Sequence, residues 1–157
     1  MAVYMLVNGI TGSSTESKHI DWIPIKSCTF PVDRPGVNTK PGKISDRLRS
    51  AVNFPAITLT KDADKSSPAL MTWMVTGATK PVQIAFCKEK GDEILLMSLT
   101  DTLLTGLTAT VNADEQPSEE LKLDFTKIVM KFTTYNKENK FDKAIEVNYN
   151  LGTAASD

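Results

Sequence analysis

The sequence predicts a mainly β protein, a sandwich or a barrel, with one short helix. Most apolar residues alternate with polar ones at a period of two, which is typical of strands that bury one face. About eight such runs, rich in β-branched and aromatic residues, are separated by turn-forming residues, as in sandwiches and barrels. A single segment combines capping residues with apolar residues four apart, which indicates a helix.

Three strands are expected in the first 60 residues. Residues 1–7 form an apolar run that ends in a turn containing Gly9 and Gly12. Residues 22–32 form a strand whose apolar positions change face midway, which indicates a bulge or a bend. Residues 52–60 alternate regularly and predict the third strand.

The helix is expected over about residues 68–76. Ser66 is placed to cap it, Pro68 occupies its first position and Gly77 follows its end. About nine residues do not hold a helix in water, so this one must lie on the sheet. We expect its Leu/Met face to be buried as core. The apolar pairs four residues apart are Leu70 with Met74 and Met71 with Val75.

The remaining strands follow the helix. They are expected at residues 82–87, 94–99, 107–111, 121–125, 128–132 and 145–151. The apolar phase slips by one residue between the runs 121–125 and 128–132. Such a slip predicts a β-bulge in the middle of a strand.

Size and composition predict one domain over residues 1–157. A chain of 157 residues with 41% hydrophobic and 24% charged residues can form a core without disulfides. Cys28 and Cys87 are therefore expected to be free, partly buried thiols. The net charge of −1 provides no general attraction to nucleic acid or to an anionic membrane. Nor does the chain contain an apolar run long enough to insert in a membrane, or a basic N-terminal region of a signal peptide.

Candidate catalytic and metal sites are scarce. His19 is the single histidine, and no nucleophile elbow accompanies it and Asp21. We expect it at the surface or at the corner of a hairpin. The cysteines lack the paired spacing of a zinc site. Glu115, Glu119 and Glu120 are explained by a solvated hairpin edge. We therefore expect a structural or binding protein, not an enzyme, with no cofactor and no metal.

A long loop is expected over about residues 33–50. It contains two Pro-Gly pairs and five basic residues against two acidic ones. Loops of more than about 12–15 residues in a compact domain are commonly functional or disordered. Both interpretations remain open: a solvated excursion, or a segment that forms a short amphipathic turn on a partner. The basic residues are Arg34, Lys40, Lys43, Arg47 and Arg49, and the apolar pair is Ile44 and Leu48.

Taken in order, these segments resemble the haemolysin-coregulated protein (Hcp) family, the tube proteins of type VI secretion. The resemblance covers nearly the whole chain. Its most specific element is the helix entry, Asp64-Lys65-x-Ser67-Pro68-x-Leu70. The other matching segments are Gly9-Ile10-x-Gly12-x-Ser14, Lys18-His19-x-x-Trp22-Ile23, Ile57-Thr58-Leu59-Thr60-Lys61, Leu99-Thr100-Asp101, the Pro117–Phe125 arm and Lys127–Tyr135.

The resemblance implies a compact two-sheet β-barrel with one flanking helix. It also implies that six copies form a ring, and that rings stack into a tube inside a contractile sheath. The tube would leave the cytoplasm with a spike at its tip, would need no signal peptide, and would carry effectors in its lumen to the outside or to a target cell. The family has no catalytic residue to transfer to this chain.

From this resemblance we expect two sets of functional residues. Thr29 would face the lumen, where cargo is held. The loop would contact a neighbouring subunit or the next ring and would meet acidic residues there. These contact residues are Arg34, Val37, Lys40, Lys43, Ile44, Arg47, Leu48, Arg49, Glu115, Glu119 and Glu120.

Two alternatives belong to other classes of protein. A monomeric ligand-binding barrel would hold an apolar molecule among Met71, Trp73 and Phe86. A hydrolase would use His19. The mass of the purified protein in solution distinguishes a ring of six copies from a monomeric ligand-binding protein.

Overall fold

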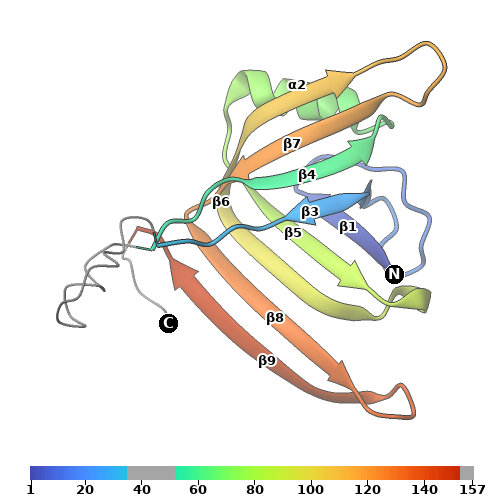
Figure 1. Cartoon of the computed structure of the whole chain (residues 1–157), viewed down its shortest axis with the longest axis vertical. Coiled ribbons are helices and arrows are strands. Elements are labelled where there is room, and N and C mark those ends of the chain that lie inside the picture. The colour runs from blue at the N-terminus through green and yellow to red at the C-terminus, as the bar shows by residue number, and fades with distance from the viewer. Residues whose placement is uncertain (35–51, 153–157) are drawn as a thin grey trace, which may run out of the picture.

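The computed structural model of the chain describes residues 1–34 and 52–152, and their regular structure is almost entirely β (Figure 1). In chain order these residues form β1 (Ala2–Val7), β2 (Ile23–Ile25), β3 (Ser27–Thr29), β4 (Ile57–Asp62), α2 (Ser67–Thr76), β5 (Lys80–Cys87), the 3₁₀ turn η1 (Glu89–Gly91), β6 (Glu93–Thr110), β7 (Ser118–Asp124), β8 (Lys127–Tyr135) and β9 (Phe141–Asn150). The predicted mainly β class and the helix predicted at about residues 68–76 are confirmed.

The strands pair antiparallel in two sheets that share the long strand β6 (Figure 1). Sheet A has the order β2, β1, β5, first half of β6, β8, β9. Sheet B has the order second half of β6, β7, β4, β3. The change of sheet lies next to Asp101, whose φ is 50°, because Thr102 still pairs with β5 whereas Leu103 already pairs with β7.

The chain passes between the sheets a second time at Lys26, between β2 and β3. The Lys26 N–H donates a hydrogen bond of 2.7 Å to the Thr60 carbonyl of β4. This confirms the bend predicted within residues 22–32. Both sheets therefore turn one face towards a shared interior.

The core consists of the apolar residues on these inner faces. Met5 and Ile84 in sheet A and Leu59 and Leu121 in sheet B are completely buried. Apart from Ala85 of β5, which is also buried, their neighbours along each strand are exposed or partly exposed, as the period of two requires. The alternation therefore identifies the core in both sheets.

Helix α2 covers one end of this core with a different face from the one expected. Leu70 and Trp73 are buried, whereas Met71 is 62% exposed and Val75 is 81% exposed. Met74 is also exposed, so the predicted burial of the Leu/Met face is correct for Leu70 and wrong for both methionines. Apolar residues four apart occur on two adjacent stripes of this helix, so their spacing does not show which stripe is buried. The large Trp73 ring determines which stripe packs on the sheet. Gly77 ends the helix with φ 66°, as predicted.

Two strand predictions need correction. The expected strands 94–99 and 107–111 are parts of the single strand β6. The phase slip after residue 125 is not a bulge, because β7 ends at Asp124 and β8 begins at Lys127. β7 pairs with the second half of β6 and β8 with its first half. The slip therefore marks the passage of the chain from sheet B to sheet A.

Gly12 is needed for a close approach of two backbone segments. Its N–H donates a 2.7 Å hydrogen bond to the Asp21 carbonyl. A Cβ atom at this position would lie 2.3 Å from the Trp22 carbonyl oxygen, which is shorter than any real contact. The glycine thus holds the start of the loop between β1 and β2 against its end.

The two ends of the predicted loop 33–50 are joined. Asp33 and Asn53 form an isolated bridge with backbone hydrogen bonds of 3.0 and 2.7 Å. Arg34 is exposed. The remaining loop residues that we expected at subunit contacts lie outside the described residues.

Candidate functional site

The outer face of sheet B is rich in hydroxyl groups and includes Thr29. Inner positions of these strands carry Ile57, Leu59, Leu121 and Leu123, so the alternate residues must point away from the core. Two cross-strand rows result. One contains Thr29, Thr58, Lys122 and Gly106, and the other contains Ser27, Thr60, Glu120 and Thr108. We call these eight residues the polar face.

Close contacts organise the polar face. Ser27 and Thr60 share a hydrogen bond of 2.5 Å between their hydroxyl oxygens. The aliphatic part of the Lys122 side chain lies over Gly106. A Cβ atom added at Gly106 would be 3.2 Å from Lys122 Cδ. Lys122 and Glu120 carry opposite charges on the same strand, so the face is hydroxylated and close to neutral. Such a surface offers many weak hydrogen bonds without binding one charged ligand strongly.

The structure separates the three acidic residues that were expected together on a solvated edge. Glu115 and Glu120 are exposed, but Glu119 is only 8% exposed. Its Oε2 accepts a hydrogen bond of 2.7 Å from Nζ of the fully buried Lys61. The expectation of a solvated Glu119 is therefore wrong, because its side chain faces the interior. The subunit contact at Glu115 and Glu120 stays a prediction.

Lys61 is the centre of a buried ionic cluster that the sequence analysis missed. Its Nζ also lies 3.2 Å from Asp64 Oδ1 and donates to the Ser67 hydroxyl at 3.5 Å. The signal was present in the sequence, since Lys61 continues the buried alternation of Ile57 and Leu59. The cluster joins β4 and β7 to the beginning of α2.

Asp64 also connects the cluster to the helix entry. It accepts hydrogen bonds from the Ser66 N–H at 2.9 Å, from the Ser66 hydroxyl and from the Ser13 hydroxyl at 2.9 Å. Burial alone would raise the pKa of Asp64, but these hydrogen bonds and Lys61 lower it on balance. Ser66 makes no side-chain cap of its own, so Asp64 orders the helix start.

His19 is buried and not at the surface, which corrects the expectation for this residue. Its ring is 1% exposed, stacks on Tyr4 at 4.9 Å and meets Trp22 edge-on at 4.7 Å. Nδ1 lies 2.6 Å from Glu16 and Nε2 lies 3.0 Å from Glu93. The hydrogen bond from His19 is the main reason that the pKa of Glu16 is lowered. His19 thus fastens the loop between β1 and β2 to sheet A.

Both cysteines are free, and both are poor nucleophiles. Burial raises the pKa of Cys28 to about 11. The pKa of Cys87 is also raised to about 11, mainly by burial and further by Glu93 and Glu16. At neutral pH both are protonated thiols. The 3.7 Å contact between Cys87 Sγ and His19 Nε2 therefore does not activate the sulfur.

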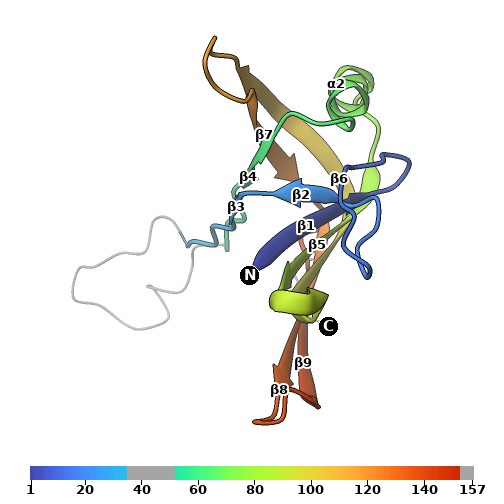
Figure 2. The same ribbon diagram turned by 90° about the vertical axis from the view of Figure 1, so that its right-hand side faces the viewer.

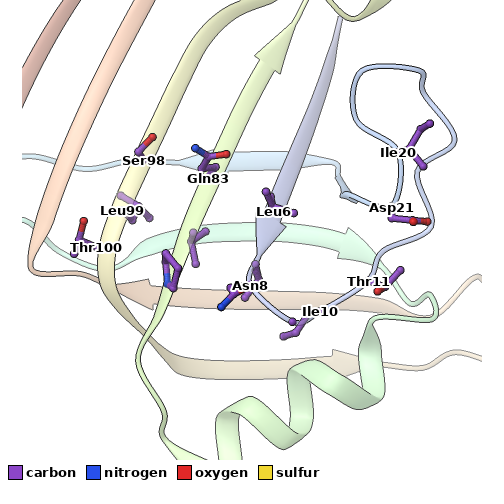
Figure 3. A pocket seen from close by; sticks show the side chains of 14 residues that line it. Leu6, Asn8, Ile10, Thr11, Ile20, Asp21, Gln83, Ser98, Leu99 and Thr100 are labelled. Atoms are coloured by element: carbon purple, nitrogen blue, oxygen red, sulfur yellow. The ribbon is translucent and has the colours of Figure 1, made fainter.

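A pocket of about 620 Å³ lies on the face of sheet A that points away from the core (Figure 3). Leu6, Gln83 and Ser98 are cross-strand neighbours in its floor. The turn after β1 and the loop at Ile20 and Asp21 form its wall (Figure 3). Its lining is mainly apolar, with some amide and hydroxyl groups and a single carboxylate, so it does not provide an acid–base pair.

The cavity required by the ligand-binding alternative is not formed by the residues proposed for it. Trp73 is buried, but Met71 of the same helix points to solvent. The five main pockets of residues 1–34 and 52–152 do not bring Met71, Trp73 and Phe86 together in their linings. In the described part of the chain, α2 is too short to cross a membrane.

Comparison with protein families identifies residues 4–132 as matching the family described as "Type VI secretion system effector, Hcp". A comparison with curated proteins gave no match.

Solved structures provide a second comparison. A structure described as a type six secretion system protein has a TM-score of 0.90 at 15% identity, with 99% of each chain covered. Hcp1 from Salmonella typhimurium has a TM-score of 0.79 at 17% identity, covering 99% of this chain and 98% of the other. A type VI secretion system effector from Yersinia pestis has a TM-score of 0.75 at 21% identity, covering 94% and 98%. At these identities the similarity concerns the fold.

Proposed function

This chain belongs to the Hcp family of the type VI secretion system, and from that membership we propose that it is a subunit of the secreted inner tube. Six copies form a ring, and rings stack into a tube that is assembled in the cytoplasm inside the sheath. The tube is then expelled with the spike. The match of residues 4–132 to the family carries this proposal.

The polar face gives the proposed tube a suitable inner wall. In a ring that places sheet B towards the axis, Thr29 and its hydroxyl-bearing neighbours line the lumen. A neutral, hydroxylated wall holds different effectors weakly enough to release them. The exposed position of Thr29 on this face supports its expected role.

The assembly is tested by the mass and shape of the purified protein. We expect light scattering to give a mass near six times the 17.2 kDa of one chain, and negative-stain images to show rings. A single-chain mass at every concentration would contradict the proposal and would favour a monomeric ligand-binding protein.

The cargo role has its own test. Thr29→Gln places a larger side chain on the polar face and is expected to leave the rings intact while reducing the amount of a secreted effector that co-purifies with them. Thr79→Gln is the matched control, because Thr79 is exposed outside sheet B. Equal effector recovery from both variants would contradict a role for Thr29 in the lumen.

A further inference from the structure

The turn that follows β1 contains the one Asn-Gly pair of the sequence, Asn8-Gly9. The Ile10 N–H donates a hydrogen bond of 3.0 Å to the Val7 carbonyl, so Asn8 and Gly9 are the central residues of a four-residue β-turn. Gly9 has φ 81°, whereas φ of Asn8 is not positive. This combination belongs to a type II turn, which favours glycine at its second central position.

Both central residues of this turn are open to solvent. Asn8 and Gly9 are exposed, and Figure 2 shows the loop between β1 and β2, in blue, extending from the sheets on the side where α2 lies. Within residues 1–34 and 52–152, no hydrogen bond ties the side-chain amide of Asn8, and none is donated by the Gly9 N–H. Water therefore reaches the amide, and the backbone nitrogen that follows it is free to react.

Lys80 contacts the peptide group between these two residues. Its Nζ donates a hydrogen bond of 3.3 Å to the Asn8 carbonyl oxygen. A Cβ atom added at Gly9 would lie 3.8 Å from the same Nζ. The oxygen that accepts this hydrogen bond belongs to the amide whose nitrogen is that of Gly9. The ammonium group therefore stabilises the anion that forms when the Gly9 N–H loses its proton, because hydrogen bonds between charged groups are the strong ones.

The residue after an asparagine decides how easily its backbone nitrogen can reach the side-chain amide. A side chain on that residue crowds the nitrogen, and glycine has none. Every other asparagine of the sequence is followed by a residue that carries a side chain. Asn8 is thus the asparagine at which this attack is least hindered.

We propose that Asn8 is a site of non-enzymatic modification, at which the side chain loses ammonia and closes a cyclic imide that water then opens. The deprotonated Gly9 nitrogen forms a bond to Asn8 Cγ. The bond from Cγ to Nδ2 breaks, and ammonia leaves with a proton returned by solvent. Water adds to one of the two ring carbonyls, which gives aspartate when the bond to Cγ opens and isoaspartate when the backbone carbonyl opens. One water is consumed, one ammonia is released, and nothing is oxidised or reduced.

Either product changes the pocket on the outer face of sheet A. Asn8 lies in the lining of this pocket, near Leu6 and Ile10 (Figure 3). The new carboxylate joins a lining in which Asp21 is the single acidic residue. Isoaspartate also leads the backbone through an extra methylene group, so the turn cannot keep its hydrogen bond unchanged. The modification therefore gives aged molecules an added negative charge at this pocket, whether or not they assemble into rings.

The test follows the loss of the amide in the purified protein, kept in mildly alkaline buffer. Tryptic peptides from successive samples are weighed, since exchange of the amide for a carboxylate raises the mass by one unit. We expect Asn8 to be converted several-fold faster than Asn112, an exposed asparagine that is followed by Ala113, and to give both aspartate and isoaspartate. Conversion at Asn8 that is no faster than at Asn112 overturns the proposal.

Variants test the route and the part of Lys80 in it. Lys80→Met removes the ammonium group and should slow the conversion several-fold. Lys26→Met is the matched control, because Lys26 is an exposed lysine paired with Asp62, away from the turn, and it should keep the wild-type rate. Thermal unfolding shows whether Lys80→Met is folded, and Lys80→Gln replaces it if it is not.

The remaining outcomes also decide. A folded Lys80 variant that is converted as fast as the wild type overturns the part assigned to Lys80. Asn8→Gln must close a larger ring, so its peptide is expected to keep its mass over the same period. An equal mass gain in that variant overturns the imide route.

Discussion

Lys61 and Glu119 form a buried ion pair, with Lys61 Nζ 2.7 Å from Glu119 Oε2. They are neighbours on the paired strands β4 and β7, where Lys61 faces Glu119 in the register. Because Asp64 and Ser67 share the same ammonium group, the pair also determines where α2 begins on the sheet. The helix entry that carries the family resemblance is thus explained by one buried lysine.

Removing the lysine should destabilise the fold strongly. Lys61→Met leaves Glu119 buried without its cation, and we expect a loss of about 3–5 kcal/mol in the free energy of unfolding. Urea unfolding measures it. Lys26→Met is the control, because Lys26 is an exposed partner of Asp62 and should change stability by less than about 1 kcal/mol. Equal stabilities of the two variants would show that the buried pair is dispensable.

The orientation of α2 can be tested with two adjacent residues. Leu70→Ala opens a cavity in the core and should lower the free energy of unfolding by about 2–5 kcal/mol. Met71→Ala changes an exposed side chain and should have an effect of about 0.5 kcal/mol or less. The reverse order, measured by urea unfolding of both variants, would mean that the helix packs with its other stripe.

Asp64 should make stability depend on pH in the acid range. Its pKa is lowered in the folded state from the ordinary value of 3.8, so its stabilising contribution is complete above that value and disappears as the pH falls through the folded pKa. We expect Asp64→Asn to melt at a lower temperature than the wild type at about pH 7. The difference between the two melting temperatures should become smaller towards about pH 3. A gap that is constant across these pH values would contradict the assignment.

The two thiols should react slowly in the native protein. With a pKa of about 11, each has roughly three hundredfold less thiolate at neutral pH than a free cysteine of pKa about 8.5. Timed labelling with iodoacetamide, followed by mass spectrometry, should show both Cys28 and Cys87 protected until urea unfolds the chain. Native labelling as fast as that of the unfolded protein would be the contrary result.

The basic loop is proposed to connect rings through charge. Arg47→Glu with Arg49→Glu should shorten tubes in negative-stain images while the chain stays folded, because the reversed charges would repel acidic groups such as Glu115 and Glu120. Raised salt should weaken wild-type stacking in the same direction. The control reverses Lys65 and Lys90, two exposed lysines of other segments. Unchanged tube length in the Arg47/Arg49 variant would refute the role of the loop.

Much of the fold could be predicted from local pattern. The alternation in residues 82–87 places Val82 and Ile84 inside, and the structure buries both. Gly77 likewise ends α2 as expected. For the site, Thr29 was expected on the lumen wall. It is exposed on the polar face, and its place in a lumen stays a prediction. Charged and polar residues were the source of error. Lys61, Glu119 and His19 are buried because each finds partners from segments distant in the sequence. The alternation of Ile57 and Leu59 indicates the inward position of Lys61, but no local pattern reveals which distant groups these three side chains meet.

By itself the sequence determined the class of the fold, the position of its helix and the inward face of most strands, because these follow from spacing along a few neighbouring residues. The tertiary structure alone decided that β6 runs through both sheets, which stripe of α2 is buried, and which charges lie inside. It also decided that Phe132, Ile145 and Val147 of the β8–β9 hairpin are exposed. These features depend on which distant strands pair and on how far each sheet reaches over the other. The spacing of apolar residues and the local propensities of the sequence carry no information about pairing or about coverage.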